Sequence, residues 1–250
     1  MFNKKKKYSL TTKIFIINNF FFLTFFILFS FFPNLDILVA NLFYYDDRFV
    51  AEHYPILKHI RSIFKDFMIF IPLVALTIIL FMLINKKQKV LRDKPFNQIR
   101  INLMALGLLI GPIIGCGIIA NLYFKDTWGR ARPVHIEEFG GDKIYTPPFI
   151  KSDQCEKNCS WIGGEAAAAF SFITGILILK NPIFYIWFNL LFGLLVSILR
   201  MSLGGHFLSD NLFAAIFMIY LALTYKAFVL LIIKKKHTIK KFFKFFYANQ

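Results

Sequence analysis

Residues 101–133 read INLMALGLLIGPIIGCGIIANLYFKDTWGRARP, an apolar run that ends in a cluster of charges. Ile101–Phe124 contains no charged residue and exceeds the roughly 20 apolar residues that a helix needs to cross a bilayer. Lys125 and Arg132 follow directly. Charged side chains are costly at a membrane unless they serve a site. The stretch therefore predicts a transmembrane helix that carries functional cations at its end.

Other apolar runs occur on both sides of this one. Apolar residues make up 57% of the chain and the mean hydropathy is +0.58, above the usage of soluble proteins. We therefore expect an all-α fold, a polytopic membrane helical bundle with six transmembrane helices that form a single integral membrane domain over residues 1–250. The expected spans are Ile14–Phe32, Asp66–Ile84, Ile101–Phe124, Ala166–Leu179, Pro182–Leu199 and Phe207–Ile233. A cleaved signal peptide is the rival interpretation of the first run, but its length favours a retained anchor.

The charge distribution predicts the orientation of these helices. The net charge is +16, but Lys and Arg flank the apolar runs, so we expect anionic membrane lipids as partners and no nucleic acid. The N-terminal segment, the 85–100 loop, Lys180 and the tail from 234 hold 18 of the 30 Lys and Arg. Of the 14 Asp and Glu, these segments hold only Asp93. Six spans would place all four segments on one side, which the positive-inside rule makes the cytoplasm, together with both termini.

Two more charged strings lie at the edges of apolar runs, WIGGE at 161–165 and RMSLGGHFLSD at 200–210. His206 and Asp210 are four residues apart and share one face of a helix. A carboxylate that accepts a hydrogen bond from one imidazole nitrogen leaves the other nitrogen free to attack phosphorus. The guanidinium fork of Arg200 suits bidentate phosphate binding. A helix-end histidine with a local carboxylate partner would give the same pattern, so this string alone is not specific.

Taken together, the three strings resemble the type-2 phosphatidic acid phosphatase superfamily, whose signature is K-x6-R-P, then P-S-G-H, then S-R-x5-H-x3-D. The first element is matched by Lys125, Arg132 and Pro133, and the third by Arg200, His206 and Asp210. Leu199 replaces the serine of the third element. The order and the intervals also agree, and the resemblance covers residues 100–215, the last four predicted helices.

This resemblance implies a phosphatase core in the last four helices and a metal-independent enzyme without a cofactor. It implies that His206 is the nucleophile and that Asp210 orients it. Lys125, Arg132 and Arg200 would hold the phosphate oxygens.

The second element departs from the family pattern, because Ile162–Glu165 stands where P-S-G-H is usual. Gly163 and Gly164 keep backbone N–H groups at a helix N-terminus, where phosphate binds readily. Glu165 replaces the histidine that protonates the leaving alkoxide, a step that a carboxylic acid with a raised pKa can also perform. Alternatively, Glu165 caps the helix or pairs with Arg132 or Arg200, or the enzyme is altered or inactive.

An acidic residue at this position resembles the lipid A 4'-phosphatase branch of the superfamily. This implies a lipid A-type substrate, a bacterial inner (cytoplasmic) membrane location and an active site that faces the periplasm. Undecaprenyl pyrophosphate phosphatase, lipid phosphotransferase and non-catalytic lipid-binding protein remain the alternatives, and the sequence indicates no oligomeric state. Cys155 and Cys159 lie in the predicted external loop, where an oxidising compartment favours a disulfide over a metal site.

Overall fold

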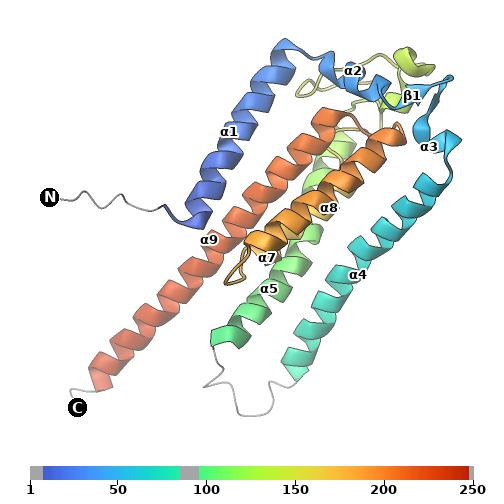
Figure 1. The fold of residues 1–250 in the computed structure, drawn as a ribbon. Coiled ribbons are helices and arrows are strands. Elements are labelled where there is room, and N and C mark those ends of the chain that lie inside the picture. The colour runs from blue at the N-terminus through green and yellow to red at the C-terminus, as the bar shows by residue number, and fades with distance from the viewer. Residues whose placement is uncertain (1–7, 85–95, 248–250) are drawn as a thin grey trace.

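The structure, a computed structural model, describes residues 8–84 and 96–247, and it describes side chains within 8–84 and 99–234. In these residues helices predominate, together with one small antiparallel hairpin and irregular loops, the longest of which lies between Phe139 and Gly164 (Figure 1). The elements are α1 (Leu10–Phe31), α2 (Leu35–Asn41), β1 (Tyr44–Tyr45), β2 (Arg48–Phe49), α3 (Val50–His53), α4 (Ile56–Ile84), α5 (Phe96–Pro112), the π-helix η2 (Ile113–Lys125), the 3-10 helices η3 (Pro133–His135) and η4 (Glu137–Phe139), α6 (Gly164–Ser171), α7 (Ile173–Ile176), α8 (Ile183–Ser202) and α9 (Leu208–Tyr247).

Five helices of the described chain are long and apolar enough to cross a membrane. They are α1, α4, the continuous α5–η2 helix, α8 and the 208–234 part of α9. The fourth predicted span corresponds to Gly164–Ile176, which forms α6 and α7 and is shorter than the five long helices. Ala166, Ala167 and Ala169 in α6 are fully buried. The count of six spans thus becomes five long helices and one short helix enclosed by the others.

The second helix begins earlier than the apolar run predicts. The run suggested Asp66, whereas α4 begins at Ile56, directly after Pro55. Proline fits the start of a helix because the first turn needs no N–H donors. Lys58 and Arg61 interrupt the apolar pattern of this first part, which is why a window of apolar residues omits it. The extra turns carry Arg61 to the end of the bundle where the charged strings lie.

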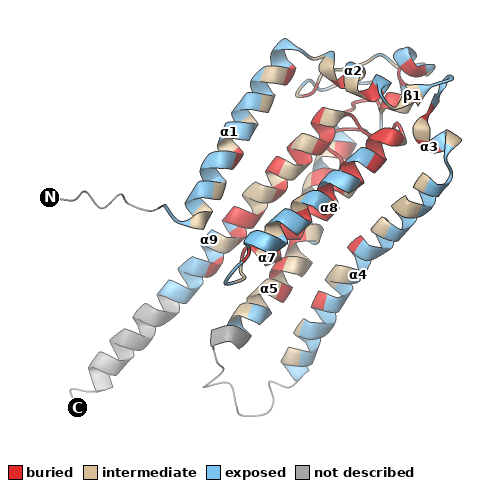
Figure 2. Ribbon diagram, viewed as in Figure 1, coloured by how far each residue is buried: buried red, intermediate tan, exposed pale blue. Residues whose placement is uncertain are grey.

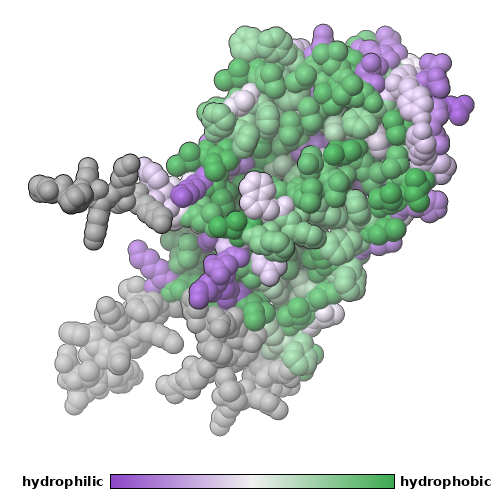
Figure 3. All heavy atoms as spheres, viewed as in Figure 1, coloured by the Kyte–Doolittle hydropathy of each residue, from purple (hydrophilic) through white to green (hydrophobic). Residues whose placement is uncertain are grey.

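Successive helices run in alternating directions, so the described ends of α1 and α9 that lead to the two termini lie at the same end of the bundle (Figure 1). The hairpin, α2, α3 and the 126–163 loop cover the other end. Buried residues concentrate in the central helices, while α1 and α4 expose most of their outer faces (Figure 2). Apolar side chains dominate the visible surface between two more polar ends (Figure 3). This belt is the surface expected to face lipid.

Small residues allow the central helices to approach closely. A Cβ on Gly107 of α5 would lie 2.7 Å from the Cα of Gly175 in α7, so the two backbones are in direct contact. Beyond Pro112, which has no N–H to donate, the helix widens into η2. This helix ends at Lys125, the first cation of the charged strings, and α6 packs beside it.

Candidate active site

The three charged strings meet at the end of the bundle covered by the 126–163 loop (Figure 1). Lys125 ends η2, Glu165 lies in the first turn of α6, Arg200 lies in the last turn of α8, and Asp210 lies in the first turn of α9. Because the helices alternate in direction, two C-terminal ends and two N-terminal ends share this level. His206 lies in the turn between α8 and α9.

His206 is buried and faces Asp210. The imidazole Nδ1 lies 3.5 Å from the Oδ2 of Asp210, and the two side chains are 1% and 0% exposed. This distance is longer than a normal hydrogen bond, and Nδ1 has no hydrogen-bond partner among the described residues. Burial lowers the pKa of His206 to about 3, with Arg200 and Lys125 acting in the same direction and Asp210 opposing them. The imidazole is therefore neutral at physiological pH.

Asp210, which faces His206, accepts hydrogen bonds from several other donors. The Nη1 of Arg130 donates to its Oδ1 over 2.6 Å, and the backbone N–H of Phe207 donates to its Oδ2 over 2.8 Å. The hydroxyl of Ser160 also donates to Oδ2. All four groups are buried, so the orientation of the carboxylate is fixed by protein contacts.

Arg130 is a central residue that the motif analysis did not single out. Its side chain is 0% exposed, and its Nη2 donates to the Oδ2 of Asp36 over 2.8 Å while its Nε donates to the carbonyl of Thr146 over 2.8 Å. Burial alone would lower the pKa of Arg130, but Asp210 and Asp36 raise it above its ordinary value. An arginine two residues before Arg132 was visible in the sequence, but no pattern distinguished its role.

Asp36 comes from α2, far from the three strings in sequence. Its carboxylate also accepts hydrogen bonds from the backbone N–H and the hydroxyl of Ser209, over 2.8 and 2.5 Å. These hydrogen bonds connect α2 to the first turn of α9, next to Asp210. A lone aspartate in an external loop gave no sequence signal for this contact.

Three predicted phosphate ligands lie around the histidine. Lys125 and Arg200 are 8% and 5% exposed, and Arg132 is half-buried. The charges of Arg132 and Arg200 both act on Lys125, and those of Lys125 and Arg200 both act on His206. The Nε of Arg200 is buried without a hydrogen-bond partner among the described residues. Unpaired donors beside a neutral histidine are suited to an anionic ligand.

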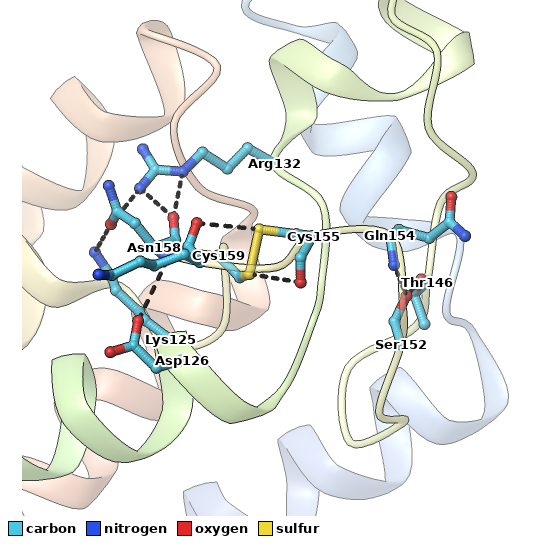
Figure 4. The surroundings of a disulfide bond; sticks show 10 residues. Lys125, Asp126, Arg132, Thr146, Ser152, Gln154, Cys155, Asn158 and Cys159 are labelled. Atoms are coloured by element: carbon cyan, nitrogen blue, oxygen red, sulfur yellow. Dashed lines mark hydrogen bonds between the residues drawn. A yellow bond between two sulfur atoms is a disulfide. The ribbon is translucent and has the colours of Figure 1, made fainter.

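Asn158 contacts two of these cations, as Figure 4 shows. Its Oδ1 accepts from the Nζ of Lys125 over 3.4 Å and from the Nη2 of Arg132 over 2.8 Å. A disulfide joins Cys155 and Cys159 and closes the short loop that contains Asn158. Sequence analysis indicated the cysteine pair but gave no role to the asparagine between them.

Glu165 forms an ion pair with Arg61 and lies close to Arg200. The Nε and Nη2 of Arg61 donate to its carboxylate over 3.1 and 2.5 Å, and the Nη1 of Arg200 lies 3.8 Å away. The pairing with Arg200 was one of the alternatives raised from the sequence. Arg61 was missed because it lies in the first turns of α4, outside the predicted span.

The two glycines before Glu165 differ in their contacts. The N–H of Gly163 already donates to the carbonyl of Asp210 over 3.1 Å. A Cβ on Gly164 would lie 2.9 Å from the Nζ of Lys125, so any side chain there would displace this cation. Gly164 is the first residue of α6, and the first N–H groups of a helix have no acceptor within the helix.

A groove of about 560 Å³ leads from the site along the helices. Lys125, Gly164 and Glu165 line its polar end, and apolar residues such as Leu76 of α4 and Leu109 of α5 line the remainder. In the part of the chain that the structure describes, no group of three or more His, Cys, Asp or Glu side chains could hold a metal ion.

A neutral histidine beside several cations can accept and release a phosphoryl group, and the adjoining groove can hold an apolar chain. These features are those expected of an integral membrane phosphatase that acts on lipids. Residues 101–234 match the model of the PAP2 superfamily, and the chain belongs to this family. The prediction made from the three motifs is thereby confirmed.

Similar proteins from several bacteria are named lipid A 4'-phosphatase. The chain is 36% identical over 216 residues to a lipid A 4'-phosphatase of Francisella tularensis subsp. novicida, an alignment that covers 84% of this chain and 92% of the relative. It is 34% identical over 110 residues to a lipid A 4'-phosphatase of Rhizobium leguminosarum, covering 43% and 46% of the two chains. No solved structure shows a significant match.

Proposed function

We propose that this membrane phosphatase removes the 4'-phosphate from lipid A, or from a closely similar phosphorylated lipid, through a phosphohistidine intermediate on His206. The observation that carries the proposal is the buried, neutral His206, which faces Asp210 and lies in the field of Lys125 and Arg200. The names of the relatives support the choice of substrate.

In the first chemical step, the Nε2 of His206 attacks phosphorus while Nδ1 faces Asp210. The P–Nε2 bond forms and the bond between phosphorus and the sugar oxygen breaks, so the sugar leaves with its electron pair and takes up a proton. Water then attacks the phosphohistidine and releases inorganic phosphate. Asp210 stabilises the positive charge that develops on the imidazole, and the contacts from Arg130 and Ser160 hold it in place.

Lys125, Arg132 and Arg200 stabilise the negative charge of the phosphoryl oxygens as it redistributes in the transition state. Gly164 contributes an N–H at the start of α6 and leaves room for the Nζ of Lys125. Gly163 contributes space rather than a donor, because its N–H is engaged by Asp210.

Glu165 is our candidate for the acid that protonates the departing sugar oxygen. Its carboxylate is paired with Arg61, so the acid role requires that this pair loosens or that substrate binding changes the local charge. If the pair stays closed and substrate binding leaves the local charge unchanged, Glu165 instead balances the charges of Arg61 and Arg200. The two roles predict different responses to the leaving group, as developed in the Discussion.

The groove between α4 and α5–η2 supports a lipid substrate. Its polar end holds Lys125 and Glu165, and its apolar length faces the membrane belt, so a headgroup at the site would leave an acyl chain in the groove. The described helix ends next to the cationic segments, the starts of α1 and α5, lie at the opposite end of the bundle, which under the positive-inside rule supports an active site on the periplasmic face of the inner membrane.

The test is to incubate purified protein with lipid A and to follow inorganic phosphate and lipid mass. Wild type should release phosphate without an acceptor lipid and in the presence of EDTA, and a phosphoenzyme should be trapped. His206→Ala should abolish both, while His135→Ala, an exposed histidine on the same end, should not. Loss of the phosphate of lipid A only when an acceptor lipid is present, with the phosphate recovered on that acceptor, would identify a phosphotransferase. Full activity in His206→Ala would refute the phosphohistidine mechanism.

A further inference from the structure

The small loop closed by the Cys155–Cys159 disulfide presents both oxygens of Asn158 to the candidate phosphate site (Figure 4). The carbonyl oxygen of Asn158 accepts from the Nε and Nη2 of Arg132, over 3.1 and 2.7 Å. Its side-chain Oδ1 is shared between the Nη2 of Arg132 and the Nζ of Lys125. One residue therefore contacts two like charges that would otherwise repel each other.

Backbone contacts fix the position of this loop relative to the cations. The N–H of Cys159 donates to the carbonyl of Lys125 over 3.1 Å, and the N–H of Ser160 donates to the carbonyl of Arg130 over 2.8 Å. The N–H of Asn158 lies 3.4 Å from the Oδ1 of Asp126. Cys159 is fully buried, so the disulfide anchors the exposed Asn158 to the covered interior of the loop.

The conformation of Asn158 explains why an asparagine suits this position. Its φ is +54°, in the left-handed region that asparagine tolerates better than most other residues with a side chain. This conformation turns the carbonyl oxygen and the side-chain amide toward the same side. Glycine would keep the backbone conformation without the amide, and alanine would lose the amide while straining the backbone.

The way in which Arg132 is held leaves it available to a ligand. Asn158 occupies the Nε–Nη2 edge of the guanidinium, and within the described residues Nη1 donates no hydrogen bond. An acceptor that grips one edge fixes the plane of the guanidinium and aims the remaining donors. Lys125, bound through a single Nζ contact to Asn158, also keeps donors for a phosphate oxygen.

We propose that Asn158, held by the Cys155–Cys159 loop, is a positioning residue that fixes Lys125 and Arg132 as one binding unit for the phosphoryl group of the substrate. This inference rests on the proposed function, because it assigns the two cations to phosphate. Asn158 would affect the binding of the anion and leave the chemistry at His206 unchanged.

The test measures binding of inorganic phosphate by calorimetry and turnover of a phosphate monoester in parallel, with the full-length protein in detergent. Asn158→Gly and Asn158→Ala should both weaken phosphate binding and raise KM by about tenfold, the loss expected for one hydrogen bond to a charged group. The value of kcat should change much less. Lys157→Ala, in the same loop but without a side-chain contact to the cations, is the matched control and should behave as wild type. The double variant Cys155→Ala/Cys159→Ala should shift KM in the same direction.

Three outcomes would reject the inference. If Asn158→Gly is normal and Asn158→Ala is impaired, only the backbone conformation matters. If Asn158→Gly binds phosphate more tightly than wild type, Asn158 obstructs the site instead of organising it. If kcat falls while phosphate binding is unchanged, Asn158 does not act on the cations. Wild type that binds phosphate without hydrolysing any ester would refute the proposed function, whereas the Asn158 variants would still decide the positioning role.

Discussion

Replacement of Glu165 by glutamine separates its two proposed roles. Glutamine keeps the shape of the side chain and can donate a hydrogen bond, but it has no acidic proton to give to a leaving group. If Glu165 is the general acid, Glu165→Gln should slow the enzyme strongly on lipid A, because a sugar alkoxide is a poor leaving group. It should slow hydrolysis of p-nitrophenyl phosphate only slightly, because nitrophenolate leaves without protonation.

The exposure of the Arg61–Glu165 ion pair shows how large a loss of rate must be before it indicates a catalytic role. Arg61 and Glu165 are 38% and 22% exposed, so their ion pair contributes at most about 1 kcal/mol to stability. Loss of a general acid lowers the rate about 10²–10⁴-fold, which corresponds to about 2.7–5.4 kcal/mol. A loss of this size on lipid A therefore exceeds what the broken pair alone explains.

The assay compares kcat/KM on the two substrates for wild type, Glu165→Gln and Arg61→Met. The Arg61 variant breaks the same ion pair but keeps the carboxyl group, so it controls for the structural contribution and should affect both substrates alike. Equal losses on the two substrates in Glu165→Gln would reject the acid role. Glu165 would then serve to balance Arg61 and Arg200, and the source of the leaving-group proton would lie elsewhere.

Four further outcomes are expected. Asp210→Asn should lower kcat about 10²–10⁴-fold, as for other histidine-orienting carboxylates, and slow phosphoenzyme formation measured by trapping. Arg130→Met leaves two buried carboxylates without their cation and should destabilise the fold by about 3–5 kcal/mol, seen as a lower Tm; an unchanged Tm would contradict the network. Because the pKa of His206 is lowered to about 3, the unfolded chain takes up this proton first, so stability should fall only as pH drops below about 6.5, and kcat/KM should show no acid-side loss centred near that pH. Lys143→Cys should react with an impermeant thiol reagent added from the periplasmic side, and labelling only from the cytoplasm would invert the proposed topology.

The family and the meeting of the three motifs could be predicted because the bilayer constrains both. Apolar runs of a set length alternate across the membrane, so charged strings at every second boundary must lie at the same end. Lys125 and Arg200 end one run each, and Glu165 and Asp210 begin the next ones. His206 and Asp210 do not share a helix face as expected, because His206 lies in the turn before α9. They still meet, because the carboxylate of Asp210 turns back to the N–H of Phe207, next to His206.

The contacts that were missed depend on packing between distant segments. Ser209 and Asp36 are 173 residues apart, and no periodicity relates an aspartate in a loop to a serine at a helix start. Arg61 was hidden because α4 continues beyond its apolar part, so a method based on apolar length ends too early. The fourth helix was predicted at Ala166–Leu179 and is found at Gly164–Ile176, but it is too short to count among the helices that can cross a membrane. Its apolar residues are buried against protein, and an apolar run does not distinguish this from contact with lipid.

The bond between Asp36 and Arg130 affects how genes of this kind should be recognised. The family match begins at residue 101, and every motif residue lies inside it, whereas Asp36 lies well before it. A shortened gene that kept residues 101–250 would satisfy a motif search. Its product, however, would bury Arg130 and Asp210 without the carboxylate of Asp36. Insertions or losses ahead of the first motif should therefore be constrained during evolution. Two separately made halves, 1–84 and 96–250, would have to reassemble through α2 before the active site is complete.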